Sequence, residues 1–138
     1  MPFSYTNEAS NIYYIKFEGD LNYNDHQRFR LIFDEFLNGH SFGVIFDLRY
    51  VTSAPMTLVM EQAKYMKEYE DKAKNTIIAT CIILDQKWMQ ILLNSLFMIK
   101  KPIAPNFITD DKDDAVDFIR DSIYLFNIER RRKRTTSS

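Results

Sequence analysis

The chain has 138 residues, of which 46% are hydrophobic and 27% charged, a balance that suits one compact domain and excludes a largely disordered protein. Five of its 18 basic residues form the run RRRKR at 130–134, so residues 1–129 carry 13 basic and 19 acidic residues, a net charge of about −6. Such an acidic body repels phosphate, which argues against specific nucleic-acid binding.

The N-terminal segment MPFSYTNEAS lacks the basic start and the apolar stretch of a signal peptide. No apolar run approaches the roughly 20 residues that a membrane-spanning helix needs. We therefore expect a cytoplasmic protein without a transmembrane segment. Cys81, the only cysteine, lies within the apolar run TIIATCIIL and is interpreted as a small buried hydrophobic residue.

The first predicted elements are a strand, a helix and a second strand. Apolar and polar residues alternate over residues 12–20, which indicates a strand. From about Asn24 to Leu37 apolar residues recur at the three- and four-residue spacing of a helix. The run FGVIFDL at 42–48 is typical of a central strand that is buried on both faces.

The second half of the chain continues the alternation. A helix with a charged outer face is predicted over residues 57–75, and a buried strand over 76–85. A third helix over 86–102 ends at a proline, a short strand follows at 106–109, and an acidic turn opens a last helix at 110–126.

This order, β-α-β-α-β-α-β-α, predicts an α/β fold with a mostly parallel sheet and helices packed on it. The domain is expected to occupy residues 1–126. Residues 127–138 form a basic tail that is nearly free of apolar residues, and this tail is expected to be disordered.

Three features together resemble the STAS superfamily, and within it the SpoIIAA-like branch, whose fold is similar to that of CRAL-TRIO lipid carriers. They are the small βαβαβαβα chain, the Asp-Leu pair that ends the second strand, and the closing sequence NFITDDKDDAVDFI. The resemblance covers about Asn11 to Tyr124. It implies a non-enzymatic regulatory domain that binds a partner protein, in a superfamily where some members bind apolar ligands or nucleotides.

The resemblance also implies where the partner binds, namely the loop after the second strand and the start of the next helix. The candidate contact residues are Arg49, Tyr50, Thr52, Ser53, Met56 and Thr57.

In the phosphorylatable members of the superfamily this loop carries Asp-Ser-Ser/Thr-Gly. An ungapped comparison puts Pro55 at the aspartate and Met56 at the serine, and no glycine follows, so the usual motif is missing. A shift of one residue brings Thr57 onto the site, which keeps Thr57 open as a phosphosite. Thr52 and Ser53 are interpreted as a cap for the next helix, with proline in its first turn.

The third helix is apolar around nearly its whole circumference, whereas a helix on one face of a sheet needs only an apolar stripe. Its remaining surface is covered by other parts of the chain, by a homodimer or heteromeric partner, or by an apolar ligand. The candidate residues for an interface or ligand are Trp88, Met89, Leu92, Leu96 and Phe97. The alternative function is thus a carrier or sensor of a lipid or other apolar small molecule.

No nucleotide, zinc-protease or hydrolase motif is present, so we expect no enzymatic activity and no cofactor. His26 and His40 are interpreted as turn residues, and no metal site is expected. The acidic run around Asp110 is attributed to the start of a helix. The basic tail is interpreted as a solvated segment, with nuclear targeting or contact with an anionic membrane surface as alternatives.

Overall fold

The computed structural model of the protein describes residues 3–9 and 11–136, with side chains as far as residue 133. In chain order its elements are β1 (Phe3–Ala9), β2 (Ile12–Asp20), α1 (Tyr23–Leu37), β3 (Phe42–Ser53), α2 (Met56–Thr76), β4 (Ile77–Ile83), α3 (Lys87–Ile99), β5 (Asn106–Thr109) and α4 (Lys112–Thr136).

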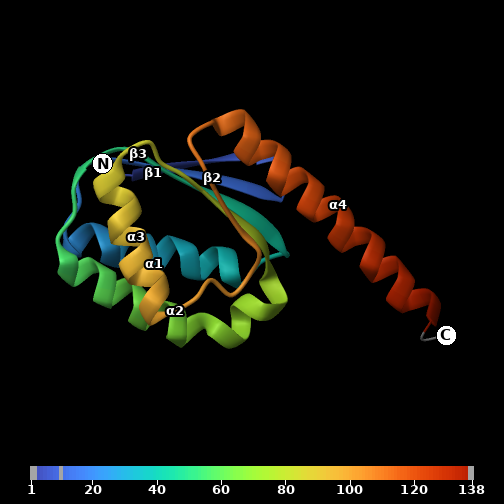
Figure 1. Cartoon of the computed structure of the whole chain (residues 1–138). Helices are drawn as coiled ribbons and strands as arrows, with labels where there is room; N and C mark the ends of the chain where they lie inside the picture. Colours follow the sequence, from blue (N-terminus) through green and yellow to red (C-terminus); the bar gives the residue numbers. More distant parts are fainter. Residues whose placement is uncertain (1–2, 10, 137–138) are drawn as a thin grey trace.

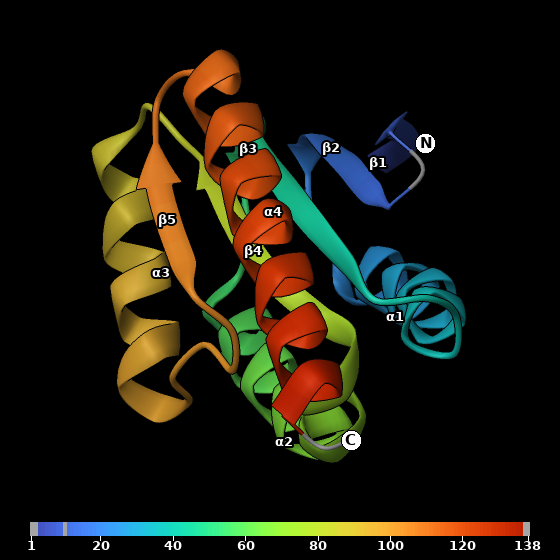
Figure 2. The same cartoon turned by 90° about the vertical axis from the view of Figure 1, so that its right-hand side faces the viewer.

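The strands form one sheet in the order β1-β2-β3-β4-β5, in which β1 is antiparallel to β2 and all other neighbours are parallel. Each crossover advances by one strand in the same direction. Because such crossovers are right-handed, α1, α2 and α3 lie together on one face of the sheet (Figure 1). The last helix, α4, covers the opposite face (Figure 2). The predicted α/β fold with a mostly parallel sheet is confirmed.

Both faces of the central strands are buried, as their apolar sequences predict. Val44 lies in the core beneath α1 and α2, whereas its neighbour Ile45 lies in the core beneath α4. Cys81 is fully buried in the α4 core, which confirms its interpretation as a buried hydrophobic residue. Burial raises the pKa of its thiol to about 12, so the thiol stays protonated at neutral pH.

Helix α1 begins with a reciprocal cap at Asn22, ahead of the start near Asn24 that the sequence predicts. The side chain of Asn22 accepts a hydrogen bond from the backbone N–H of Asp25 at 3.0 Å, and the Asp25 carboxylate accepts one from the Asn22 N–H at 2.9 Å. Two N–H groups at the helix start are thereby satisfied.

Strand β1 was not predicted from the sequence. This strand pairs with β2 along most of its length, but only Phe3 is deeply buried and the following residues are mostly exposed. An edge strand with one buried side chain leaves little hydrophobic periodicity to detect.

The expectation of a disordered tail is also not met, because α4 continues to Thr136. The residues that follow Phe126 include good helix formers and neither glycine nor proline. The guanidinium of Arg130 lies 5.6 Å from the centre of the Phe126 ring, which ties the basic run to the preceding turn. Residues 137–138 lie outside the described residues.

Helix α4 approaches β3 so closely that a side chain at Gly43 would clash with Cγ2 of Ile119. We therefore expect Gly43→Ala to lower the free energy of unfolding by about 1–3 kcal/mol, measured by urea denaturation. Gly39→Ala is the control, because its Cβ would meet Phe36 O at an ordinary 3.5 Å and should change stability by about 0.5 kcal/mol or less. Equal stability of the two variants would contradict this packing.

Candidate functional site

The candidate contact residues gather where the parallel strands end. Strand β3 runs on to Ser53, five residues beyond its predicted end, so Arg49, Tyr50 and Thr52 belong to the strand itself. Met56 and Thr57 open α2 directly afterwards. Ligand and partner sites of open parallel sheets are commonly found at this carboxyl edge.

Asp47 is fully buried and anchors this part of β3. Its carboxylate accepts hydrogen bonds from Arg49 Nε at 3.0 Å, from Arg49 Nη2 at 2.7 Å and from the Arg49 backbone N–H at 3.1 Å. The hydroxyl of Tyr14 donates a further bond from β2. Asp47 was noted in the sequence only as the end of a strand.

These bonds decide the charge of the buried carboxyl. Burial raises the pKa of Asp47, but the hydrogen bonds from Arg49 and Tyr14 outweigh burial and hold the pKa below its ordinary value. Burial, together with the Asp47 carboxylate, raises the pKa of Tyr14. At neutral pH the cluster is therefore an ionised Asp47 paired with a charged Arg49.

Tyr50 lies beside this cluster and is exposed. Its ring has the Arg49 guanidinium 5.3 Å from its centre and the Lys16 ammonium 4.3 Å away. Contacts between cations and an aromatic face are attractive. The ring thus contacts two cations while 46% of the residue remains exposed.

The interpretation of Thr52 and Ser53 as a helix cap is wrong. Both hydroxyls instead donate to Oδ1 of Asp20 at the end of β2, at 2.6 and 2.7 Å. Both hydroxyls are therefore bonded to the neighbouring strand, and neither caps the start of α2. The N-cap position is occupied by Pro55, which has no side-chain acceptor to offer.

The hydrogen bonds from Thr52 and Ser53 lower the pKa of Asp20, so its carboxylate is ionised at neutral pH. The end of β3 is therefore tied to β2 by two charge-assisted bonds.

A third connection joins β3 to the start of α3. The Gln86 side-chain amide donates to the backbone carbonyl of Arg49 at 3.2 Å, and the indole N–H of Trp88 donates to Gln86 Oε1. Trp88 is therefore positioned by the same strand that presents Tyr50. Tyr50, Trp88 and Met56 at the start of α2 are all exposed at the carboxyl edge, and we term these three residues the carboxyl-edge surface (Tyr50, Met56 and Trp88).

The candidate residues of α3 divide between its two sides. Met89 and Leu96 are buried in the core between α2, α3 and the sheet, which removes them from any interface on the outer side of the helix. Leu92 and Phe97 are half-buried against the same core. Among these five candidates only Trp88 is exposed.

The outer side of α3 is nevertheless apolar, because it carries residues that the sequence analysis did not single out. Ile91, Met98 and Ile99 are exposed, Met98 to 88%. Helical spacing within the apolar run could have separated these residues from the inward-facing ones.

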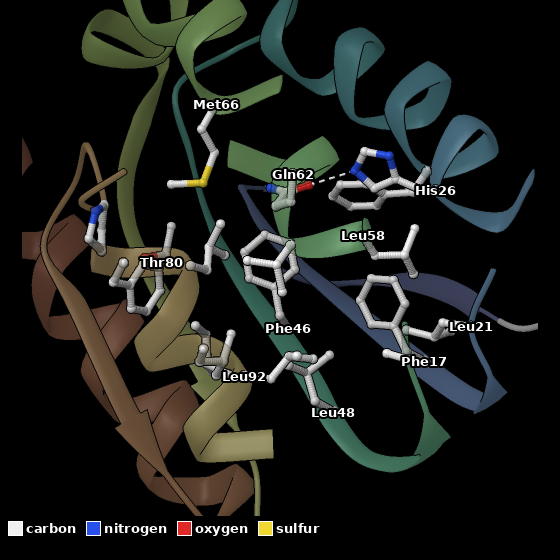
Figure 3. A pocket seen from close by; sticks show the side chains of 18 of the residues that line it. Phe17, Leu21, His26, Phe46, Leu48, Leu58, Gln62, Met66, Thr80 and Leu92 are labelled. Carbon is white, nitrogen blue, oxygen red and sulfur yellow. Dashed lines mark hydrogen bonds between the residues drawn. The ribbon is translucent and has the colours of Figure 1, made fainter. Parts of the chain in front are cut away.

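An apolar cavity of about 210 Å³ lies between the sheet and the three helices α1, α2 and α3. Phe17 and Phe46 line it from the strands, Leu58 from α2 and Leu92 from α3 (Figure 3). Met89, Leu96 and Phe97 also line it. The inward-facing candidate residues of α3 therefore all line one cavity.

One end of the cavity is polar. Nε2 of His26 donates a hydrogen bond to Oε1 of Gln62 at 2.9 Å (Figure 3), and Nδ1 of His26 is buried without a partner among the described residues. Burial lowers the pKa of His26, which keeps the imidazole neutral at pH 7. His26 is thus a half-buried residue that faces the core, not the exposed turn residue that the sequence suggested.

Among residues 3–9 and 11–136, no helix is long and apolar enough to cross a membrane. Within the same part of the chain, no group of three or more histidine, cysteine or acidic side chains could hold a metal ion.

Several solved structures resemble this chain. An uncharacterised protein of the DUF3478 family from Shewanella loihica PV-4, with a SpoIIAA-like fold, aligns with a TM-score of 0.63 over 85% of this chain and 91% of its own, at 12% identity. The anti-sigma factor antagonist SpoIIAA in its unphosphorylated form aligns with a TM-score of 0.59 over 86% of this chain and 97% of its own, at 13% identity.

An anti-sigma factor antagonist from Mycobacterium paratuberculosis aligns with a TM-score of 0.59 over 86% of this chain and 94% of its own, at 14% identity. No protein-family model and no curated protein sequence matches the chain. The structural likeness confirms the SpoIIAA-like fold that the sequence resemblance implied, and at these identities it shows the fold alone.

The Asp47–Arg49 pair can be tested by replacing one partner or both. Arg49→Met leaves a buried carboxylate without its cation, and we expect it to lower the free energy of unfolding by about 3 kcal/mol. The double variant Asp47→Leu/Arg49→Met removes both charges and should be more stable than Arg49→Met alone. Urea denaturation at pH 7 measures both, and a double variant less stable than the single one would contradict a charge-compensating role for Arg49.

Proposed function

We propose that the protein is a non-catalytic regulatory module of the STAS type that binds a partner protein through its carboxyl-edge surface. The observation that carries this proposal is the presentation of Tyr50, Met56 and Trp88 at one edge of the sheet. Aromatic and methionine side chains are enriched in the cores of protein interfaces. The likeness to two proteins named as anti-sigma factor antagonists supports a regulatory role.

The surroundings of these side chains suit an interface. Tyr50 is held by two cations and Trp88 by its bond to Gln86, so little side-chain freedom is lost when a partner covers them. Lys16 and Arg49 lie next to Tyr50, and polar side chains of this kind commonly surround interface cores.

The buried charges of the site support a structural role over catalysis. The Asp47 carboxylate is engaged by Arg49 and Tyr14, which leaves no free basic lone pair directed into a cleft. A general base needs such a lone pair within reach of its substrate.

Control by phosphorylation at Thr57 remains a prediction. Thr57 is exposed in the first turn of α2, a turn that contains no acidic residue. A phosphate there would lie near the positive end of the helix dipole and beside Met56, where its charge would alter the carboxyl-edge surface. Cytoplasmic location also remains a prediction.

The proposed surface can be tested by affinity capture from cells that express the protein. Trp88→Ala and Met56→Ala should each weaken binding of the partner captured by the wild type at least about tenfold, as is common for anchor residues at interface centres. Leu31→Ala is the matched control, because Leu31 is 70% exposed on α1, away from the carboxyl edge. The dissociation constants would then be measured with the purified partner.

Two results would overturn this assignment. One is unchanged partner binding by both Trp88→Ala and Met56→Ala. The other is equal weakening by Leu31→Ala, which would show that the loss is not specific to the carboxyl-edge surface.

As a second candidate function, we propose that the cavity binds a small apolar molecule. The favouring observation is its size, about 210 Å³, since an engineered apolar cavity of about 150 Å³ takes up benzene. Pockets for drug-sized ligands occupy roughly 300–1,000 Å³. The cavity therefore suits a single short chain or ring with one polar group at the His26–Gln62 end, and it is too small for a two-chain lipid.

A series of straight-chain alcohols tests this second function, because a ligand that binds only the folded state raises the melting temperature by an amount that grows with the ratio of its concentration to its dissociation constant. We expect the stabilisation to rise with chain length and then stop when the cavity is full. Leu92→Trp should fill the cavity and lower the affinity at least about tenfold. Ile91→Trp, on the exposed side of the same helix, is the control, and equal effects of both variants would contradict binding in the cavity.

A further inference from the structure

The outward face of α4 has an unusual order of charges. Ala115, Ile119 and Ile123 point inward and are buried against the sheet. The opposite side of the helix, which we term the outer face of α4, carries Asp113, Asp114, Asp117, Arg120, Asp121, Tyr124, Leu125, Arg131 and Arg132, all exposed.

The charges on this outer face are segregated along the helix. Its N-terminal half carries four aspartates and one arginine, whereas its C-terminal half carries Arg131 and Arg132. Between the halves lie Tyr124 and Leu125, which are 67% and 60% exposed. An apolar centre therefore separates an acidic half from a basic half.

The spacing of the two halves is symmetric. Asp117 precedes Tyr124 by seven residues and Arg131 follows it by seven. At 1.5 Å per residue each lies about 10 Å from Tyr124 along the helix axis, and seven residues correspond to nearly two full turns, so all three side chains lie on one side of the helix.

No other described helix lies on the side of the sheet that α4 covers (Figure 2). Helix α4 packs on β3, β4 and β5 as the only described helix on its side of the sheet (Figure 2). Its C-terminal half runs beyond the end of the sheet (Figure 1). An exposed tyrosine and leucine in such a position are typical of an interaction surface.

We propose that the outer face of α4 binds the same face of a second copy of this chain, with the two helices antiparallel and a two-fold axis at Tyr124. In this arrangement Asp117 of each copy lies opposite Arg131 of the other, and Arg132 lies near Asp114. A two-fold interface makes each complementary contact twice. Tyr124 and Leu125 meet their counterparts at the centre.

The same charges disfavour an anionic membrane as the occupant. Basic residues draw a segment to such a surface, but Asp117 and Asp121 share the outer face with Tyr124 and would be pressed against the same negative charge. A second copy offers each acidic half a basic half of opposite charge.

The helix pair lies across the sheet from α2 and α3, so it does not use Met56 or Trp88. It therefore goes beyond the proposed regulatory function. Because a single pair of helices buries less surface than a standard interface, we expect a weak dimer with a dissociation constant on the order of micromolar.

Sedimentation velocity of the full chain over a micromolar concentration series tests the proposal. The wild type should form a dimer that weakens as salt is added. The variants Asp117→Arg/Asp121→Arg and Arg131→Glu/Arg132→Glu should each raise the dissociation constant at least about tenfold, since each juxtaposes like charges. Far-UV circular dichroism verifies that both variants are folded.

The decisive sample is an equimolar mixture of these two variants. In the mixed dimer the unchanged acidic half of one chain meets the unchanged basic half of the other, and the two reversed halves also meet with opposite charges. The mixture should therefore dimerise as well as the wild type, although neither variant does so alone. General loss of stability cannot produce this restoration.

The control is Met98→Asp on the outer side of α3, which should leave the dimer unchanged. A monomeric wild type, or a mixture that stays monomeric, would overturn the proposal. So would loss of the dimer on Met98→Asp, because that result moves the interface to α3. Finally, the wild type could be monomeric and sediment with phosphatidylserine vesicles while Arg131→Glu/Arg132→Glu does not. That result would assign Arg131 and Arg132 to membrane contact.

Discussion

The shared hand of the three crossovers is the constraint on which the rest of the structure depends. Because each right-handed connection advances by one strand, α1, α2 and α3 must share one face of the sheet. The starts of α2 and α3 are thereby brought to the carboxyl edge, next to the end of β3. The same constraint leaves the opposite face to α4 alone. The carboxyl-edge surface and the outer face of α4 are thus two results of one topological rule.

Polar contacts at the carboxyl edge refine what the topology places there. Asp47 fixes Arg49, Asp20 fixes the end of β3, and Gln86 joins β3 to the start of α3. The first bond lies within β3, whereas the other two join β3 to β2 and to the start of α3. The apolar cavity behind this edge differs, because few polar groups line it. Its size depends on how α3 packs against the sheet.

The sequence was sufficient for the features that depend on long apolar patterns, namely the parallel strands, the helices and the burial of Cys81. The sequence was insufficient to predict the hydrogen-bond partners of polar side chains that have more than one possible partner. Serine is a preferred residue at helix N-caps, but Ser53 still belongs to β3, and its hydroxyl donates to Asp20. Likewise, an apolar run does not reveal that Met89 faces inward while Met98 faces solvent until the helix phase is known. The distant partners of Asp47 and His26 follow only from the tertiary fold.

The burial of Cys81 has a practical consequence. Its thiol is inaccessible and stays protonated at neutral pH, so maleimide reagents should not react with the folded protein. The natural chain therefore offers no reactive thiol of its own in site-specific labelling. A cysteine introduced on α1, α3 or α4 would carry the only spectroscopic probe, and pairs of such probes could report distances without any change to the native core.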